Sequence, residues 1–249
     1  MTDNASGQII IVNGSSGTGK STTCAEFVTR QCDPWLMLGI DQFLGSIFPR
    51  RYGHHGERCV EGVRAVPINT ADPDGPQRWQ FGDYGLRGFA VFHDWIATAS
   101  RAGCSIIVDH LMIQDPPILQ DCIWRLDGLP VLFVNLKPPQ EVLMDRVAQR
   151  KIGTRFSNSN YDEQQIARSK KRLEQLRPWF YEAVYLNDCF DIEIDTALHT
   201  PDRVCEQIEQ RLEAGPGSAF STLRGRYAKP ASTTVCEPGS ASDRCEESI

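Results

Sequence analysis

The sequence predicts an α/β domain in which a five-stranded parallel sheet is covered by helices on both faces. Two observations indicate this three-layer fold. Short, almost fully apolar runs recur along the chain, as expected for parallel strands that are buried on both faces, and segments with helical spacing separate them. With 249 residues, 41% of them hydrophobic and 23% charged, the chain also has enough apolar surface for one large core.

The expected strands are apolar runs bounded by glycine or polar residues. In chain order they occupy residues 8–13, 35–40, 104–109, 130–136 and 190–195. The expected helices occupy residues 21–31, 84–102, 118–126, 139–149, 162–185 and 201–213. Pro139 supports the start of its helix, because proline fits the first helical turn. The alternating order predicts parallel strands joined by helical crossovers.

Two segments do not fit this alternation. Residues 48–83 are rich in Arg, Gly, His, Pro and Asp, which predicts a long insertion or mobile loop outside the core. After residue 213 the chain turns to Gly, Pro, Ser, Thr and Glu, which predicts a disordered tail over residues 214–249. We therefore expect one domain over residues 1–213 that carries an insertion at about 48–83.

The charge and cysteine content narrow the classes of partner and the compartment. The formal net charge is −6, so the chain has no basic excess to bind nucleic acid or an anionic membrane surface. The sequence contains no run of 18 apolar residues, the length that would predict a membrane span. Its first residues do not resemble a secretory leader. The nine cysteines are scattered without a C-x-x-C pair, which is typical of reduced thiols. We expect a cytoplasmic protein with no nucleic-acid or membrane partner, and the sequence leaves open whether it forms a homo-oligomer.

The glycine-rich segment after the first expected strand has the pattern G-x-x-x-x-G-K-[ST], between a strand and a helix. Its glycines let backbone N–H groups point at phosphate oxygens, and the helix N-terminus adds its positive dipole end. Lys20 reaches the β- and γ-phosphates, and the Ser21 hydroxyl can bind Mg²⁺. The pattern predicts an ATP and Mg²⁺ site in a P-loop kinase fold. The expected nucleotide-binding residues are Gly14, Ser15, Ser16, Gly17, Thr18, Gly19, Lys20, Ser21 and Thr22.

Two aspartates end expected strands at the edge of the sheet where the phosphate loop lies. Asp109 follows Ile106, Ile107 and Val108, a position from which a carboxylate holds Mg²⁺ together with Ser21. Asp41 ends the second strand and can orient an acceptor hydroxyl and accept its proton, as a phosphotransferase requires. Each aspartate could instead cap a helix or turn.

Arginines follow the fourth expected strand. Arg146 and Arg150 are four residues apart and project from one face of a helix, and Arg155 follows in a turn. Guanidinium groups in such a segment can close over ATP and neutralise charge on the transferring phosphoryl group. A solvated basic face is the alternative.

Several motifs together resemble the chloramphenicol phosphotransferase family, P-loop kinases that phosphorylate a hydroxyl of an antibiotic. The resemblance spans about residues 8–212. It rests on the phosphate loop with its strand, on Pro34-Trp35-Leu36 followed by Gly39-Ile40-Asp41, on Ala102-Gly103 before Ile106-Ile107-Val108-Asp109, and on Phe190-Asp-Ile-Glu-Ile-Asp195-Thr196. The resemblance implies that Asp41 is the catalytic base and that Arg146 and Arg150 belong to a lid.

The chain also departs from this family's pattern. His110 stands where the family often has a second aspartate, and Arg150-Lys151-Ile152-Gly153 replaces the usual Arg-Gly-Asp-Arg. The resemblance therefore predicts an ATP-dependent kinase with a small-molecule hydroxyl as acceptor, with inactivation of an antibiotic, and hence resistance to it, as one outcome. Two alternatives stay open: a zeta-toxin-like or other small-metabolite or nucleoside kinase, and a non-catalytic module that ATP regulates.

Overall fold

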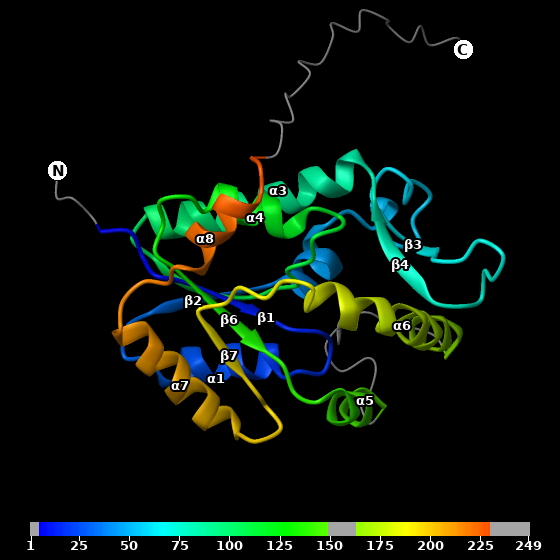
Figure 1. Cartoon of the computed structure of the whole chain (residues 1–249). Helices are drawn as coiled ribbons and strands as arrows, with labels where there is room; N and C mark the ends of the chain where they lie inside the picture. The colour runs from blue at the N-terminus through cyan, green and yellow to red at the C-terminus, as the bar shows by residue number, and fades with distance from the viewer. Residues whose placement is uncertain (1–4, 149–162, 230–249) are drawn as a thin grey trace, which may run out of the picture.

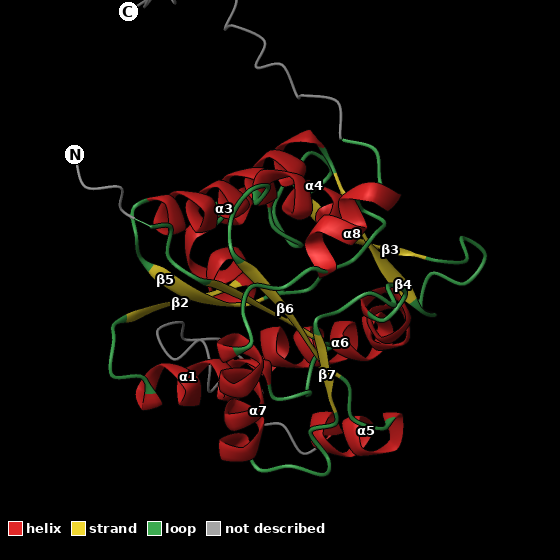
Figure 2. Cartoon of the chain, turned by 60° about the vertical axis from the view of Figure 1, so that its left-hand side comes forward, coloured by secondary structure: helices red, strands yellow, loops and turns green. Residues whose placement is uncertain are grey.

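The computed structural model describes residues 5–148 and 163–229 and has the predicted α/β fold. Five parallel strands form one sheet in the order β2-β5-β1-β6-β7, and helices cover both faces of it (Figure 1; Figure 2). The strands of this sheet are β1 (Ile9–Asn13), β2 (Trp35–Gly39), β5 (Ser105–Asp109), β6 (Val131–Leu136) and β7 (Ile192–Ile194). The remaining strands, β3 (Val63–Pro67) and β4 (Gln77–Phe81), form a separate antiparallel hairpin.

The helices agree closely with the expected ranges in the first 213 residues. The longer helices are α1 (Lys20–Arg30), α3 (Asp83–Arg101), α4 (Ile118–Arg125), α5 (Gln140–Ala148), α6 (Glu163–Val184), α7 (Pro201–Glu213) and α8 (Ala219–Arg226). A short turn of helix, α2 (Ile40–Gln42), continues into a π-helical turn, Phe43–Ile47, and a 3₁₀ turn, Arg50–Tyr52, follows. α2 and the π-helical turn thus occupy the chain directly after β2.

The central strands β1, β5 and β6 are buried on both faces, which explains their apolar sequences, whereas Leu36 and Met37 of the edge strand β2 are exposed. Ile9 and Ile11 of β1 pack in the core on the side of α3, α4 and α8, whereas Ile10 and Val12 pack in the core on the side of α1 and α7. The register aligns the carboxyl ends of the central strands: Val12 lies beside Asp109 of β5 and beside Val134 of β6. The loops that follow these strands therefore begin at one edge of the sheet.

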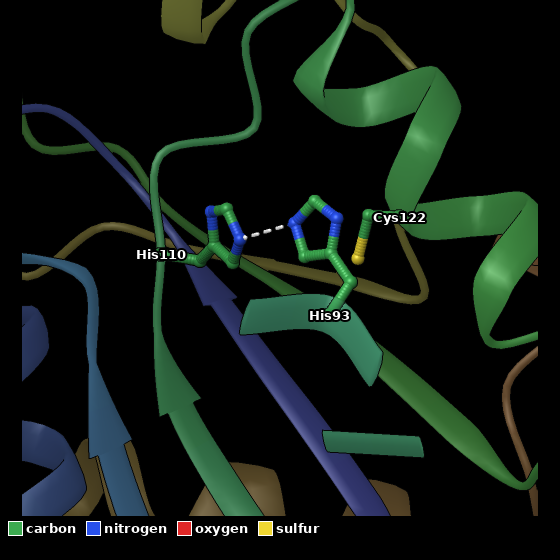
Figure 3. Close-up of side chains that lie close together, drawn as sticks. All are labelled: His93, His110 and Cys122. Atoms are coloured by element: carbon green, nitrogen blue, oxygen red, sulfur yellow. Dashed lines mark hydrogen bonds between the residues drawn. The ribbon is translucent and has the colours of Figure 1, made fainter. Parts of the chain in front are cut away.

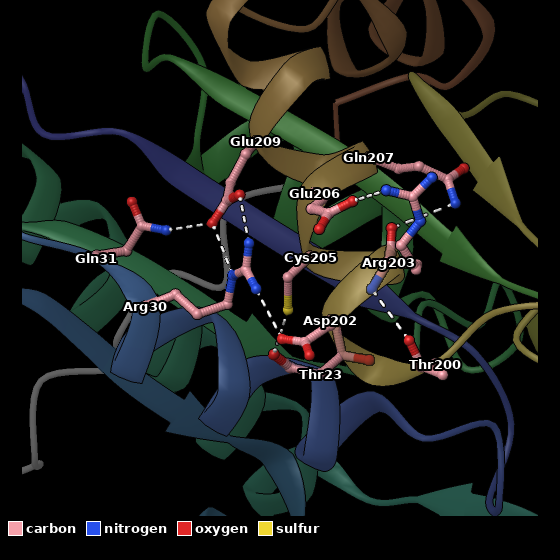
Figure 4. A network of polar contacts seen from close by, with 10 residues as sticks. All are labelled: Thr23, Arg30, Gln31, Thr200, Asp202, Arg203, Cys205, Glu206, Gln207 and Glu209. Atoms are coloured by element: carbon pink, nitrogen blue, oxygen red, sulfur yellow. Dashed lines mark hydrogen bonds and ion pairs between the residues drawn. The ribbon is translucent and has the colours of Figure 1, made fainter.

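A polar network fastens α7 to α1 on one face of the sheet (Figure 4). The Arg30 guanidinium donates to Glu209 over 3.3 and 3.2 Å and to Asp202 over 2.7 Å. The Gln31 amide donates to Glu209 over 2.9 Å. Together with the apolar contacts beneath it, this network fixes α1, the helix that begins in the phosphate loop.

Residues 48–83 are not the open loop that we expected. Their two strands, β3 and β4, pair antiparallel with Ala65 beside Trp79, and their alternating side chains separate an apolar face from a polar one. Val63 and Trp79 are buried in the main core, while Arg64 donates to Gln80 on the other face. The expectation that this segment lies outside the core is wrong for the hairpin, because two short alternating strands bury enough aromatic surface to fold onto α3 and α6.

The expected disordered tail is also wrong in its first part, because α8 packs on the sheet. Phe220 contacts the Phe133 ring with centroids 5.2 Å apart, and Leu223 is buried. The Asp191 carboxylate accepts from the backbone N–H groups of Ser218 and Ala219 at the start of this helix. Phe220 and Leu223 are three positions apart and therefore lie on the same face of this helix, towards the core. Residues 230–249 lie outside the described part of the chain.

Candidate active site

The predicted phosphate loop lies between β1 and α1 and has the backbone that its glycines allow. Gly14, Gly17 and Gly19 have φ values of 153°, 92° and 96°, a region that residues with a side chain rarely adopt. At Gly14 a Cβ atom would also lie only 2.8 Å from the carbonyl oxygen of Leu136. The first glycine of the motif is thus required for close approach to β6 as well as for backbone curvature.

Lys20 begins α1 and is largely buried, with 8% of its surface exposed. Its ammonium group donates to the carbonyl oxygens of Gly14, at 2.7 Å, and Ser15, at 3.1 Å, and lies 3.6 Å from a carboxylate oxygen of Asp109. Desolvating an ammonium group is costly unless oxygen atoms surround it. The loop therefore holds a positive charge at its centre, where a phosphate group can replace these contacts.

Ser21 and Asp109 meet at the carboxyl ends of the central strands. The Ser21 hydroxyl donates directly to the second carboxylate oxygen of Asp109. A hydroxyl and a carboxylate are the hard oxygen ligands that Mg²⁺ prefers, and Mg²⁺ is usually held by few protein groups. These two residues therefore have the right chemistry and juxtaposition for the predicted magnesium site.

The other residues expected to bind nucleotide lie along the loop and the first turn of α1. Thr18 is buried and its hydroxyl donates to the Ser15 carbonyl oxygen over 3.0 Å. Ser16 is half-buried, and Thr22 is exposed on α1. The Ser15 hydroxyl is buried and has no hydrogen-bond partner among the described residues.

Asp41 lies in the single turn of α2, two residues after the end of β2. Gly39 of β2 pairs with Asp109 of β5, so the chain reaches Asp41 from the strand beside the predicted magnesium ligand. The Asp41 residue is exposed, and the N-cap of this short helix is Gly39 rather than Asp41. Asp41 thus follows β2 at the carboxyl edge of the sheet, the edge at which the phosphate loop begins after β1, and β5 lies between these two strands.

Arg146 contacts the phosphate loop through a residue that the sequence analysis did not assign. Its guanidinium donates to the hydroxyl of Thr196 over 2.9 Å and to the carbonyl oxygen of Thr196 over 2.8 Å. The Thr196 hydroxyl donates in turn to the carbonyl oxygen of Thr18 in the loop, over 2.9 Å. Arg146 therefore connects α5 to the loop. Arg150 and Arg155 lie outside the described residues.

Three further residues around the loop were missed by the sequence analysis. The Asn13 amide donates to Asn135 over 2.9 Å and to the carbonyl oxygen of Val184 over 3.1 Å. The Tyr185 hydroxyl donates to the Leu136 carbonyl oxygen over 2.8 Å and lies 3.3 Å from the backbone nitrogen of Ser15. The end of α6 is thereby held against the loop. Polar residues at the ends of buried strands were the available signal for Asn13 and Asn135.

Behind Asp109, two buried histidines form a hydrogen-bonded chain (Figure 3). The backbone N–H of Leu111 donates to His110 Nδ1 over 2.7 Å, and His110 Nε2 lies 3.0 Å from His93 Nε2. His93 Nδ1 lies 2.6 Å from Asp121, which also accepts from Arg125. Burial lowers the pKa of His110 well below its ordinary value. Burial alone would raise the pKa of Asp121, but the hydrogen bond from His93 and the charges around it lower it.

This chain of contacts fixes the tautomers and argues against a metal ion. His93, His110 and Cys122 offer ligand atoms within 4.8 Å of one another, which is compatible with a metal site by distance alone. However, the Leu111 amide can only donate, so His110 Nδ1 must accept and His110 Nε2 carries the proton. That proton points at His93 Nε2, whose ring donates through Nδ1 to Asp121. A metal ion would need the nitrogen that holds the proton, so we interpret the cluster as a satisfied buried network.

Comparisons with known proteins agree with this fold. The family model described as chloramphenicol phosphotransferase-like protein matches residues 7–213. The APS kinase CysC of Mycobacterium tuberculosis, solved in complex with AMPPNP and APS, matches with a TM-score of 0.50 and 11% identity over 84% of this chain and 98% of that chain. The solved structure of APE1195 matches with a TM-score of 0.52 and 12% identity, over 84% and 96% of the two chains. At these identities the likeness concerns the fold.

No curated protein sequence is significantly similar to this chain. Among the described residues, none of the helices combines the length and the apolar character that a membrane crossing needs.

Proposed function

This chain belongs to the chloramphenicol phosphotransferase-like family, and from that premise we propose that it transfers the γ-phosphate of ATP to a hydroxyl group of a small molecule. The observation that carries the proposal is the contact of Lys20, Ser21 and Asp109 at the carboxyl ends of adjacent strands. A positive charge, a hydroxyl and a carboxylate converge there, beside a glycine-rich loop whose backbone can curve around a phosphate group. A turn with only a structural role would not require a buried ammonium group, a hydroxyl and a carboxylate in contact with one another.

In this proposal the loop binds the triphosphate of ATP. The backbone N–H groups between Gly14 and Ser21 and the N-terminus of α1 face the phosphate oxygens. Lys20 exchanges its contacts with the Gly14 and Ser15 carbonyl oxygens for the β- and γ-phosphates. Ser21 and Asp109 would hold Mg²⁺, which supplies positive charge to the phosphate oxygens when it is bound. Arg146 keeps the loop in place through Thr196.

Asp41 is the base in this proposal. The acceptor oxygen forms a bond to the γ-phosphorus, and the bond from that phosphorus to the bridging oxygen breaks, so its electron pair leaves with ADP. The proton of the acceptor hydroxyl passes to a carboxylate oxygen of Asp41. The exposure of Asp41 at the carboxyl edge of the sheet supports this role, because an acceptor must approach from solvent. Arg150, which the family resemblance assigns to a lid, stays a prediction.

The test is a screen for ATP-dependent phosphorylation of hydroxylated antibiotics and metabolites, with chloramphenicol as the first compound. Product is identified by its added phosphate mass, and ADP is measured in parallel. Lys20→Ala serves as the matched inactive control, because it keeps the fold and removes the loop cation. Phosphorylated product with the unsubstituted protein and none with Lys20→Ala supports the proposal. ATP binding without transfer to any compound of a broad set would favour a regulatory module instead.

A further inference from the structure

Tyr185, the residue that directly follows α6, joins the phosphate loop to the end of β6. Its hydroxyl accepts the backbone N–H of Ser15 over 3.3 Å and donates to the carbonyl oxygen of Leu136 over 2.8 Å. Gly14 lies against the same carbonyl group, since a Cβ atom on this residue would be 2.8 Å from the Leu136 oxygen. One phenol oxygen therefore bridges the loop and the neighbouring strand at the point where the loop begins.

Three contacts from different parts of the chain hold Tyr185 in place. The carbonyl oxygen of Val184, the residue before it, accepts from the Asn13 amide at the end of β1. The ammonium group of Lys137, which follows β6, lies 5.5 Å from the centre of the Tyr185 ring. The ring of Tyr181, one turn earlier in α6, packs edge-on against it with centroids 5.2 Å apart. These contacts fix the direction in which the hydroxyl points.

The hydroxyl of Tyr185 remains a hydrogen-bond donor at neutral pH. Burial raises the pKa of this phenol to about 12, although the backbone hydrogen bond from Ser15 lowers it in part. A protonated phenol can accept one hydrogen bond and donate another, whereas a phenolate can only accept. The Leu136 carbonyl has no proton to give, so the observed pair of contacts requires the protonated form.

The phosphate loop benefits from such a support because its curve restricts flexible residues. Gly14, Gly17 and Gly19 have φ values of 153°, 92° and 96°, and glycine loses more freedom than any other residue when its backbone is fixed. A buried backbone N–H group that faces no phosphate also needs another acceptor. The Tyr185 oxygen supplies this acceptor to Ser15 from the side of β6, and it does so without a nucleotide.

We propose that Tyr185 is a positioning residue for nucleotide binding, which holds the start of the phosphate loop in the curve that phosphate groups require. The inference rests on the proposed role of the loop in binding ATP and adds a residue outside the motif. Tyr185 acts through Ser15 and not on the reacting atoms. A loop that already has this curve binds a triphosphate without first losing the freedom of its glycines.

The expected effect follows from removing the bridging oxygen alone. In Tyr185→Phe the ring stays, but the Ser15 N–H and the Leu136 carbonyl each lose a partner. The loop then spends part of its time in other conformations, and the apparent affinity falls with the fraction that keeps the binding-competent curve. We expect about tenfold weaker binding of the phosphate chain from the loss of these hydrogen bonds. The KM for ATP should rise by the same factor, with kcat at saturating ATP almost unchanged.

The experiment measures binding to the phosphate loop directly. Two probes are titrated calorimetrically in the presence of Mg²⁺: a non-hydrolysable ATP analogue and inorganic tripolyphosphate, which has the phosphate chain without base or sugar. Hydrogen exchange of the backbone amides at residues 14–18 is followed in the protein without nucleotide. Turnover is assayed separately on any acceptor that the screen identifies.

Tyr181→Phe is the matched control for this experiment. It removes a hydroxyl one turn earlier in the same helix and keeps the ring that packs on Tyr185. Among the described residues, no hydrogen bond joins the Tyr181 hydroxyl to the loop. Circular dichroism and the unfolding midpoint establish that each variant is folded.

The outcomes separate the role of Tyr185 from the kinase function. Tyr185→Phe should bind both probes about tenfold more weakly and exchange its loop amides faster, whereas Tyr181→Phe should match the unsubstituted protein. Unchanged affinity of folded Tyr185→Phe for tripolyphosphate would overturn the proposal, whether or not the ATP analogue binds more weakly. No binding of either probe to the unsubstituted protein would overturn it together with the proposed function. A tenfold loss in a protein that phosphorylates no acceptor would count against phosphoryl transfer and leave the role of Tyr185 standing.

Discussion

The phosphate loop differs from the aromatic cluster between the β3–β4 hairpin and α6 (His54, Trp79, Trp179 and Phe180) in how its polar groups are satisfied. In the loop, Lys20 already contacts two carbonyl oxygens and Asp109, and Ser21 donates to that carboxylate. In the cluster, the Trp79 N–H has no partner among the described residues. A ligand at the loop must therefore exchange existing contacts, whereas the Trp79 N–H stays unsatisfied inside a packed cluster of rings. The loop thus keeps its charged groups available to another partner, and the cluster serves packing.

The largest expected effect tests the loop side of this comparison. Lys20→Ala removes the charge that the loop concentrates on the β- and γ-phosphates, and loss of a preorganised charge typically costs about 10²–10³-fold or more in rate. We expect turnover to fall below detection while the circular dichroism spectrum and the unfolding midpoint change little. Near-normal turnover in a folded Lys20→Ala protein would show that phosphoryl transfer does not depend on the loop.

The second prediction separates the two aspartates. Asp41→Asn keeps the shape and hydrogen-bonding reach of the side chain but loses its proton affinity, so kcat should fall about 10²- to 10⁴-fold with ATP affinity almost intact. Asp109→Asn should weaken the dependence of the rate on Mg²⁺ together with the rate itself, because Asp109 contacts Ser21. Both are measured by steady-state kinetics with varied Mg²⁺. Normal turnover of Asp41→Asn on the true acceptor, with Asp109→Asn inactive, would mean that the base is another residue.

The same contrast explains which parts the sequence could predict. The phosphate loop was predictable because its chemistry is local: four fixed positions, a strand before it and a helix after it. The parallel sheet was predictable because its central strands, β1, β5 and β6, are buried on both faces and hence continuously apolar. These predictions are confirmed for the fold and the family.

The remaining parts depend on contacts between distant residues. Trp79 and Phe81 alternate with polar residues in a strand of only five, and such a short alternation is indistinguishable from a loop without its partner strand. His54, Trp79 and Arg172 are over a hundred residues apart at the extremes and come together only because the hairpin folds onto α6. Thr196 is the last residue of the motif at residues 190–196. Its contacts with Thr18 and Arg146 could not be predicted, because they depend on how the sheet brings these distant residues together.

A third prediction concerns the buried chain of His93 and His110. His93→Ala removes the acceptor of the His110 N–H and a donor to Asp121, and it leaves a cavity in the core. We expect the free energy of unfolding to fall by about 3 kcal/mol. Urea denaturation at pH 7.5 measures this change. His199→Ala, at an exposed position, should alter it by less than about 0.5 kcal/mol.

The same experiment tests the tautomer assignment against a metal site. If the network is satisfied by protons alone, the unfolding midpoint of the unsubstituted protein is the same with and without a strong chelator. A lower midpoint in chelator, together with loss of a stoichiometric metal ion in His93→Ala, would show that His93, His110 and Cys122 hold a metal instead.

The smallest expected effect tests whether the ring of His54, which packs on Trp79 in the aromatic cluster, is removed from water in the folded protein. Its folded pKa of about 3 lies below the ordinary value of 6.5, so between these values the unfolded chain binds a proton that the folded protein does not. The free energy of unfolding should therefore fall as the pH falls below about 6.5, by up to about 0.8 kcal/mol from this residue at pH 6.0. His54→Gln should lose this part of the pH dependence. The difference between the two proteins in urea denaturation at pH 8.0 and pH 6.0 isolates it, because all other groups contribute equally. An identical pH dependence in both would mean that the His54 ring is solvated in the folded protein.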